Sequence, residues 1–177
     1  MTIKTDIILS AEHLFDHHGF TATGVDKLVE AAGVSSRTFY KHVGSKNALV
    51  AAVLDARGKR FFEVTSVESV DGLFGALADW TEANGARGCL FFRADRETGG
   101  AVPEVSEAVA AYREGLQRLI GSLVAREGVH GGSDSLAEQL LVLVEGATSA
   151  ASYRGPSAIH TARAIAALLV KNARTQG

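Results

Sequence analysis

Apolar side chains recur along most of the chain at the three- and four-residue steps of an amphipathic helix. The first such segment carries Ile7, Ala11, Leu14 and Phe15 on one side, and Gly19 then stands where a left-handed residue commonly ends a helix. We find no alternating pattern of strand length and no internal repeat. The pattern therefore predicts an all-α protein of about nine helices.

The second predicted helix is short. Its apolar stripe consists of Val25, Leu28, Val29 and Ala32. Thr23 is expected to cap its start, with Asp26 three residues later as its capping-box partner. Gly33 then ends the helix, because glycine readily adopts the backbone angle that a sharp turn needs.

The third predicted helix is short and basic. Ser35 opens it, and Phe39 and Val43, four residues apart, are expected to face inward. Its outward side chains can all donate hydrogen bonds; they are Ser36, Arg37, Thr38, Tyr40, Lys41 and His42. A helix of this kind fits the major groove of DNA, where its first residues reach base edges. Two short helices joined at a glycine have the proportions of a helix-turn-helix, so they predict a DNA-binding head.

The net charge of −2 argues by itself against a nucleic-acid-binding protein, but its distribution changes that conclusion. Six basic residues and one acid lie between Arg37 and Arg60, so this stretch carries +5 and the rest of the chain −7. A local basic patch on an acidic body suits the binding of a polyanion at one end. The basic residues are Arg37, Lys41, Lys46, Arg57, Lys59 and Arg60, and the acid is Asp55.

The remaining chain predicts a body of longer helices. One begins at Lys46, and further helices are expected over about 71–84, 103–127, 136–153 and 156–173. The last two are nearly uncharged in their middles, so they must be covered on more than one side. An ordinary core pair and a dimer interface both satisfy that requirement.

The chain has one cysteine, Cys89, and therefore no intrachain disulfide framework, which fits a reducing compartment. The N-terminus shows no signal peptide, and no run of about 18 apolar residues is present to span a membrane. These features predict a cytoplasmic protein. Cys89, beside Leu90 and Phe91, is interpreted as a buried small apolar residue in preference to a thiol sensor.

Residues Thr21 to Leu49 read Thr-x-Thr-x-Val-x-x-Leu-Val-x-x-Ala-Gly-Val-Ser-x-x-Thr-Phe-Tyr-Lys-His-Val-x-Ser-Lys-x-x-Leu. This motif resembles the N-terminal signature of the TetR family of repressors, over about residues 3–50. The resemblance implies a homodimer whose two heads enter successive major grooves of a palindromic double-stranded operator, and a small-molecule effector that relieves repression. It also implies a DNA-binding domain over 1–46 and a ligand-binding and dimerisation domain over 47–177, with the dimer formed by the helices at 136–153 and 156–173.

The resemblance assigns DNA-binding roles to individual residues. The recognition-helix positions are Arg37, Thr38, Tyr40, Lys41 and His42, with Ser36 beside them. Lys46 falls on a phosphate-contacting lysine, and Thr23 and Lys27 fall near DNA-facing positions of the preceding helix. Gly24 replaces the hydroxyl residue often found at its position.

Candidates for an effector pocket are aromatic and charged residues of the body: Trp80, Phe92, Arg93, Tyr112 and Glu145. Plain core packing is the alternative for the aromatic ones. Glu145 stands among apolar residues and is expected to need a partner, either across a dimer or in a polar ligand. His13 and His17 have a spacing that holds metals but lack a third ligand, so neither a metal site nor a cofactor is predicted.

Two other functions are alternatives to DNA binding. An enzyme finds no support, because the chain has no glycine-rich phosphate loop, no His-Glu-x-x-His pair and no Gly-x-Ser-x-Gly motif. A helical small-molecule-binding protein that no longer reads DNA is disfavoured by the intact basic helix. We therefore predict a transcriptional regulator, a repressor released by an apolar or amphipathic effector, and no enzyme.

Overall fold

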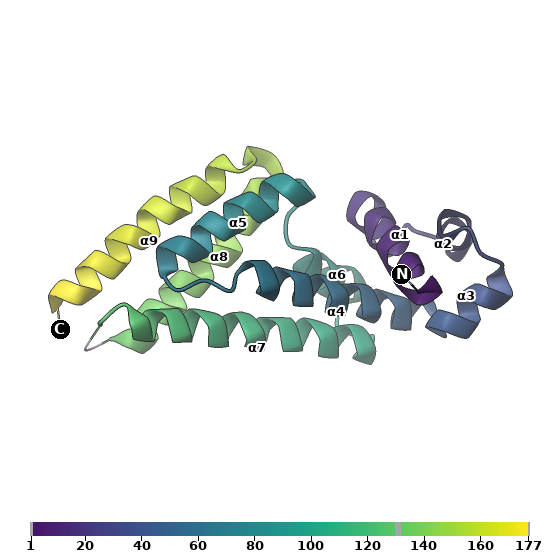
Figure 1. Cartoon of the computed structure of the whole chain (residues 1–177), viewed down its shortest axis with the longest axis horizontal. Coiled ribbons are helices and arrows are strands. Elements are labelled where there is room, and N and C mark those ends of the chain that lie inside the picture. Colours follow the sequence, from purple (N-terminus) through teal and green to yellow (C-terminus); the bar gives the residue numbers. More distant parts are fainter. Residues whose placement is uncertain (1, 130–131, 177) are drawn as a thin grey trace. The chain divides into compact units, whose positions relative to one another are not determined.

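The computed structural model describes residues 2–129 and 132–176, which form nine helices and no strand (Figure 1). The all-α prediction is confirmed for these residues. The helices are α1 (Ile3–His18), α2 (Val25–Ala32), α3 (Ser36–Val43), α4 (Lys46–Val64), α5 (Val70–Asn84), α6 (Leu90–Thr98), α7 (Pro103–Arg126), α8 (Ser133–Arg154) and α9 (Ser157–Gln176). Only α6 has bounds that the sequence pattern did not define. In the two described ranges, no helix combines the length and hydropathy needed to cross a bilayer.

The chain divides into two compact units. The first runs to Lys59 and resumes from Leu90 to Tyr112, and the second comprises Arg60–Cys89 and the chain from Arg113 onward. The division between the units therefore does not coincide with the predicted boundary between residues 46 and 47, since α4 and α7 contribute residues to both units. That boundary remains a proposal about which residues bind DNA.

The first unit is held by a core of large apolar side chains from its short helices. Helix α1 contacts α2 and α3, and Phe15, Leu28 and Phe39 are at most 1% exposed. The ring of Phe20, in the turn after α1, lies 4.9 Å from that of Phe15. Burial of each such side chain contributes roughly 1.5–3 kcal/mol, which keeps three short helices together that would be unstable alone.

The second unit is built around α9, which packs against α5 and α8. Leu73, Phe74, Leu140 and Ile159 are at most 1% exposed and fill this core. Gly115 of α7 is set against the ring of Phe62, where an added Cβ would lie 2.6 Å from Cζ. A side chain at this position would have to displace the ring of Phe62.

A paired carboxylate and guanidinium join α5 to α9 at the surface of the second unit. Arg163 donates from Nε and Nη2 to the two carboxyl oxygens of Asp71, at 2.6 and 2.5 Å. These hydrogen bonds, together with the attraction of the cation, hold the pKa of Asp71 below its ordinary value of 3.8. Folding therefore gains stability from this carboxyl only while it is ionised.

Replacing Asp71 with Asn should lower the melting temperature slightly at neutral pH, because exposed ion pairs contribute little. The folded-state pKa is the lower one, so the contribution is complete above the unfolded value near 3.8 and is lost as the pH falls further. We expect the melting temperatures of the two proteins to converge in that acid range. Thermal unfolding from neutral to acid pH measures this, with Asp55→Asn on α4 as the control. A gap that stays constant with pH would contradict the assignment.

Candidate nucleic-acid interface

Helix α3 is fixed at both ends by its own sequence. Ser35 accepts a hydrogen bond at its Oγ from the amide of Thr38, at 3.2 Å, which satisfies one donor of the first turn. At the other end, the amide of Gly44 donates to the carbonyl of Tyr40 at 2.9 Å. The predicted opening at Ser35 is confirmed, and Gly44 ends the helix.

The two sides of α3 differ sharply in exposure. Phe39 is fully buried and Val43 is 8% exposed, so both anchor the helix as predicted. The opposite side presents a hydroxyl, a guanidinium, a phenol and an ammonium group in one short helix. Its exposed residues are Ser36, Arg37, Tyr40 and Lys41, and Thr38 and His42 are half-buried beside them. This is a rigid helix with a polar, cationic face, as a reader of the major groove requires.

The turn between α2 and α3 depends on Gly33. Its φ of 62° and ψ of 29° are left-handed, and its amide closes the end of α2 on the carbonyl of Glu30 at 3.0 Å. An added Cβ would meet no atom within 4 Å. The requirement for glycine is therefore conformational, and a side chain here would strain the angle between the two helices.

The start of α2 differs from the prediction. Gly24 is the N-cap and no side chain caps the helix, whereas Thr23 is 1% exposed and donates its hydroxyl to the carbonyl of Gly19 at 2.6 Å. The predicted capping box of Thr23 and Asp26 is wrong, and the side chain of Thr23 is withdrawn from the candidate interface. Uncapped amides at a helix start are free to meet a phosphate, and Lys27 is exposed on the same helix.

Not all six basic residues counted between Arg37 and Arg60 lie at the surface, because Arg57 is buried. Arg57 donates from Nη1 to Oε1 of Glu12 on α1 at 2.9 Å, and their side chains are only 9% and 10% exposed. A buried pair of this kind ties α4 to α1 and presents no charge to a ligand. Lys46, predicted to contact phosphate, is half-exposed at the start of α4, just after Ser45 caps that helix through the amide of Ala48 at 3.0 Å.

The predicted effector-pocket residues are divided between the two units. Tyr112 stacks on Phe91 with ring centroids 3.7 Å apart, and Phe92 is 51% exposed. Arg93 is hydrogen-bonded to the end of α1. The other two, Trp80 and Glu145, belong to the second unit.

In that unit, Trp80 packs edge-on against Phe61, with ring centroids 5.7 Å apart. Glu145 is exposed on α8, and its partner across a dimer or in a ligand stays a prediction. The effector pocket stays a prediction.

The structure also places the two remaining candidates from the sequence, the histidine pair of α1 and Cys89. His13 and His17 are exposed on α1, and Nδ1 of His17 bonds to the carbonyl of His13 at 2.8 Å. Within the described ranges, no three potential metal ligands of the His, Cys, Asp or Glu type are grouped together. Cys89 is half-exposed, so the expectation that it is buried was wrong.

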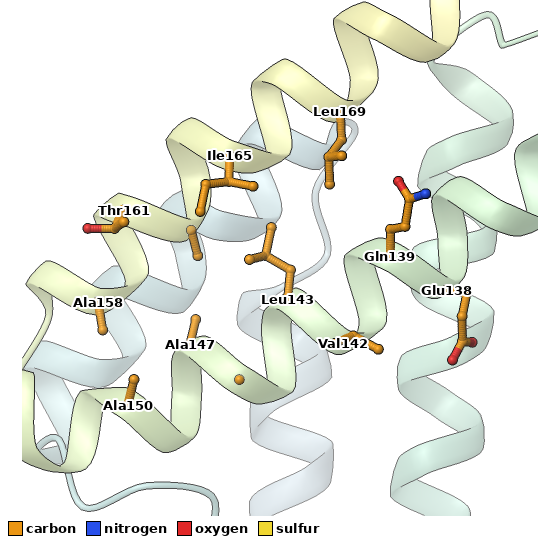
Figure 2. Close-up of a pocket in the computed structure, with 12 residues that line it drawn as sticks. Glu138, Gln139, Val142, Leu143, Ala147, Ala150, Ala158, Thr161, Ile165 and Leu169 are labelled. Atoms are coloured by element: carbon orange, nitrogen blue, oxygen red, sulfur yellow. The ribbon is translucent and has the colours of Figure 1, made fainter.

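A second surface lies along α8 and α9. Figure 2 shows Leu143 of α8 and Ile165 and Leu169 of α9 pointing toward the same space between the helices. The groove there has a volume of about 540 Å³, and small residues such as Ala147 and Ala162 line it. On the same helices, Val142 and Leu168 are 61% and 60% exposed. A single chain thus leaves this apolar face in contact with water.

Comparisons with known proteins match the N-terminal head to a family and the whole chain to a fold. Residues 7–53 match the family described as bacterial regulatory proteins, tetR family. Among solved structures, a TetR-family transcriptional regulator from Streptomyces coelicolor is similar at a TM-score of 0.83 and 24% identity, covering 97% of this chain and 96% of that one. GusR from Salmonella enterica gives 0.71 at 25% identity, with 96% and 95% covered, and the reduced form of NemR from E. coli gives 0.75 at 24%, with 96% and 95% covered. A search of curated proteins finds no match.

Proposed function

We propose that the chain is a DNA-binding transcriptional regulator of the TetR family, a homodimeric repressor that releases its operator when a small molecule binds. One observation carries the DNA-reading part of this proposal. Helix α3 buries Phe39 completely while exposing Ser36, Arg37, Tyr40 and Lys41. An eight-residue helix held in this way can enter the major groove and direct several donors at base edges.

The apolar face of α8 and α9 supports a second copy of the chain as its partner. Val142, Ile165 and Leu168 are between 42% and 61% exposed, and the groove beside them is lined mainly by alanine, valine, leucine and isoleucine. Exposed apolar surface of this kind marks an interaction site. A two-fold dimer covers the same face on both copies at once, and its symmetry calls for an operator with two matching half-sites.

The third part of the proposed function is a small-molecule effector. Trp80, Phe92, Arg93, Tyr112 and Glu145 remain the candidate contacts, and the apolar composition of the body favours an apolar or amphipathic molecule. Because such a regulator meets its operator on the chromosome, we place it in the cytoplasm.

DNA binding can be tested with the sequence upstream of the chain's own coding region. Titrations by fluorescence anisotropy at several salt concentrations should show an operator bound at least about 10³-fold more tightly than random DNA. Arg37→Ala should weaken operator binding by about 1–3 kcal/mol, roughly 5- to 150-fold, if the guanidinium meets a base. Arg118→Ala on α7, a 73% exposed cation paired with Glu114, is the matched control and should change nothing.

Two outcomes would count against this function. If no upstream sequence binds better than random DNA as salt rises, the chain is not a specific reader. If it forms a folded dimer that binds small molecules and is indifferent to any DNA, it is a binding protein with an inactive head. If Arg37→Ala keeps the same preference at every base, Arg37 does not contact a base, and the proposed function of the chain is unaffected.

A further inference from the structure

We propose that Arg93 and Glu97 of α6 are positioning residues of the DNA-binding head: without contacting DNA, they hold the turn between α1 and α2 and thereby set operator affinity. This inference rests on the proposed function. It concerns residues of the first compact unit alone. Neither residue belongs to the helix-turn-helix motif, and both are more than 70 positions from their partners in α1 and the turn.

Arg93 binds the last turn of α1. Its Nη1 donates to the carbonyls of Asp16 and Phe15 at 2.9 and 3.3 Å, and its Nη2 lies 3.5 Å from Oδ1 of Asp16. The side chains are 25% exposed for Arg93 and 7% for Asp16, so the contact is largely shielded from water. Carbonyls at the end of a helix lack partners within the helix, and a cation there also complements the helix dipole.

Glu97 binds the turn that follows. Its Oε2 accepts a hydrogen bond from the amide of Thr21 at 2.7 Å. The same carboxylate lies over Gly19, where an added Cβ would come within 2.8 Å of Oε1. Gly19 also has a φ of 83°, so glycine is needed both for the backbone angle and for the approach of this carboxylate.

The two side chains act as a pair because they lie four residues apart on α6, on one face of the helix. One holds the carbonyls before Gly19 and the other holds the amide after it. Each charge suits the group that it binds: the guanidinium of Arg93 donates to carbonyl oxygens, and the carboxylate of Glu97 accepts from an amide. The carbonyl of Phe15 also accepts from the amide of Gly19 at 2.9 Å, whereas the carbonyl of Asp16 and the amide of Thr21 depend on α6 for their partners.

The turn held in this way controls where α2 begins. Thr23 donates its hydroxyl to the carbonyl of Gly19, and α2 starts two residues later. Helix α2 is joined to α3 by the tight left-handed turn at Gly33. A shift of the turn at Gly19 therefore moves the start of α2, and α3 has no flexible connection that would absorb the movement.

The contribution of Arg93 and Glu97 to positioning can be separated from a contribution to stability by comparing specific and non-specific DNA binding. Arg93→Ala and Glu97→Ala should weaken operator binding about tenfold each, as expected if the aligned head becomes a one-in-ten population. Binding to random DNA and its salt dependence should stay unchanged, because the phosphate-contacting cations are intact. Glu97→Gln, which retains an oxygen acceptor for the Thr21 amide, should recover most of the affinity. Arg96→Ala, on the same helix and stacked over Phe92, should behave as wild type.

Hydrogen exchange of the Thr21 amide gives a readout that does not depend on DNA. It should be faster in Glu97→Ala than in Glu97→Gln at equal melting temperature. If Arg93→Ala does not fold, Arg93→Lys replaces it, since lysine keeps the charge but loses the planar fork that reaches two carbonyls.

The outcomes distinguish this inference from the proposed function. Folded variants that bind the operator as tightly as wild type would overturn the inference and leave the regulator assignment standing. Equal losses of specific and non-specific binding, in proportion to the unfolded fraction, would also overturn it by showing a role in stability alone. A wild-type chain without operator preference would overturn the proposed function itself.

Discussion

A glutamate in place of Val142 should convert the protein to a monomer and remove most of its operator affinity. Val142 is 61% exposed on α8, so the single chain tolerates the change, but a second copy on this face would bury the charge. Two-fold symmetry places one new carboxylate on each copy. A cost of about 3 kcal/mol for each unpaired buried charge makes the dimer roughly 10⁴-fold weaker. Light scattering coupled to gel filtration at micromolar concentration measures the mass, and anisotropy measures operator binding.

The controls for this experiment keep either the apolar character or the charge. Val142→Leu keeps the face apolar and should remain a dimer. Gln117→Glu adds the same charge at an exposed position of α7 and should leave the mass unchanged. A Val142→Glu protein that is still a dimer at micromolar concentration would show that the two copies meet elsewhere.

Truncation of Phe39 to alanine should cost about 3–5 kcal/mol of folding free energy, which is a large share of the stability of an ordinary domain. The ring is fully buried on the inner side of α3, and its centroid lies 5.6 Å from that of Tyr40, with the two rings edge-on. Its removal leaves a cavity under a helix of only eight residues. Urea unfolding followed by circular dichroism measures the loss, and operator binding should fall with the folded fraction of the head.

Tyr40→Ala is the matched comparison, since it is the adjacent residue and is 47% exposed. It should lose little stability but weaken operator binding under conditions where the protein is fully folded. Phe39→Leu should recover much of the stability, because it refills most of the volume. If Phe39→Ala unfolds at the same urea concentration as wild type, the head is not anchored by this ring.

The features predicted correctly from the sequence are those set by neighbouring residues. Helical spacing identified the short helices of the head, Ser35 identified the start of α3, and Gly33 identified the turn before it. Each depends on contacts within a few positions, where residue type and spacing decide the outcome. The polar face of α3 was predictable for the same reason, since burial of Phe39 and Val43 determines which side remains outside.

The features that were missed depend on partners far away in the chain. Arg57 was counted with the basic patch because nothing near it indicates that Glu12, 45 residues earlier, would neutralise it. The bonds of Arg93 to the end of α1 were not predicted either, because its partners lie 77 and 78 positions away. Thr23 is the exception, because its hydroxyl bonds to the carbonyl of Gly19 only four positions earlier and so does not cap α2. Local spacing could not decide the cases of Arg57 and Arg93, because their partners are set by three-dimensional proximity.

The enclosed ion pair between Glu12 and Arg57 also affects how salt acts on the protein. Mobile ions screen charges at the surface over a Debye length of about 10 Å at 0.1 M. They screen the pair of Glu12 and Arg57 much less, because its side chains are about nine-tenths buried. Rising ionic strength therefore loosens contacts with phosphates while α1 and α4 stay joined. Across the concentrations at which operator binding is titrated, a change in affinity reports on the DNA surface, and the interior of the head keeps its shape.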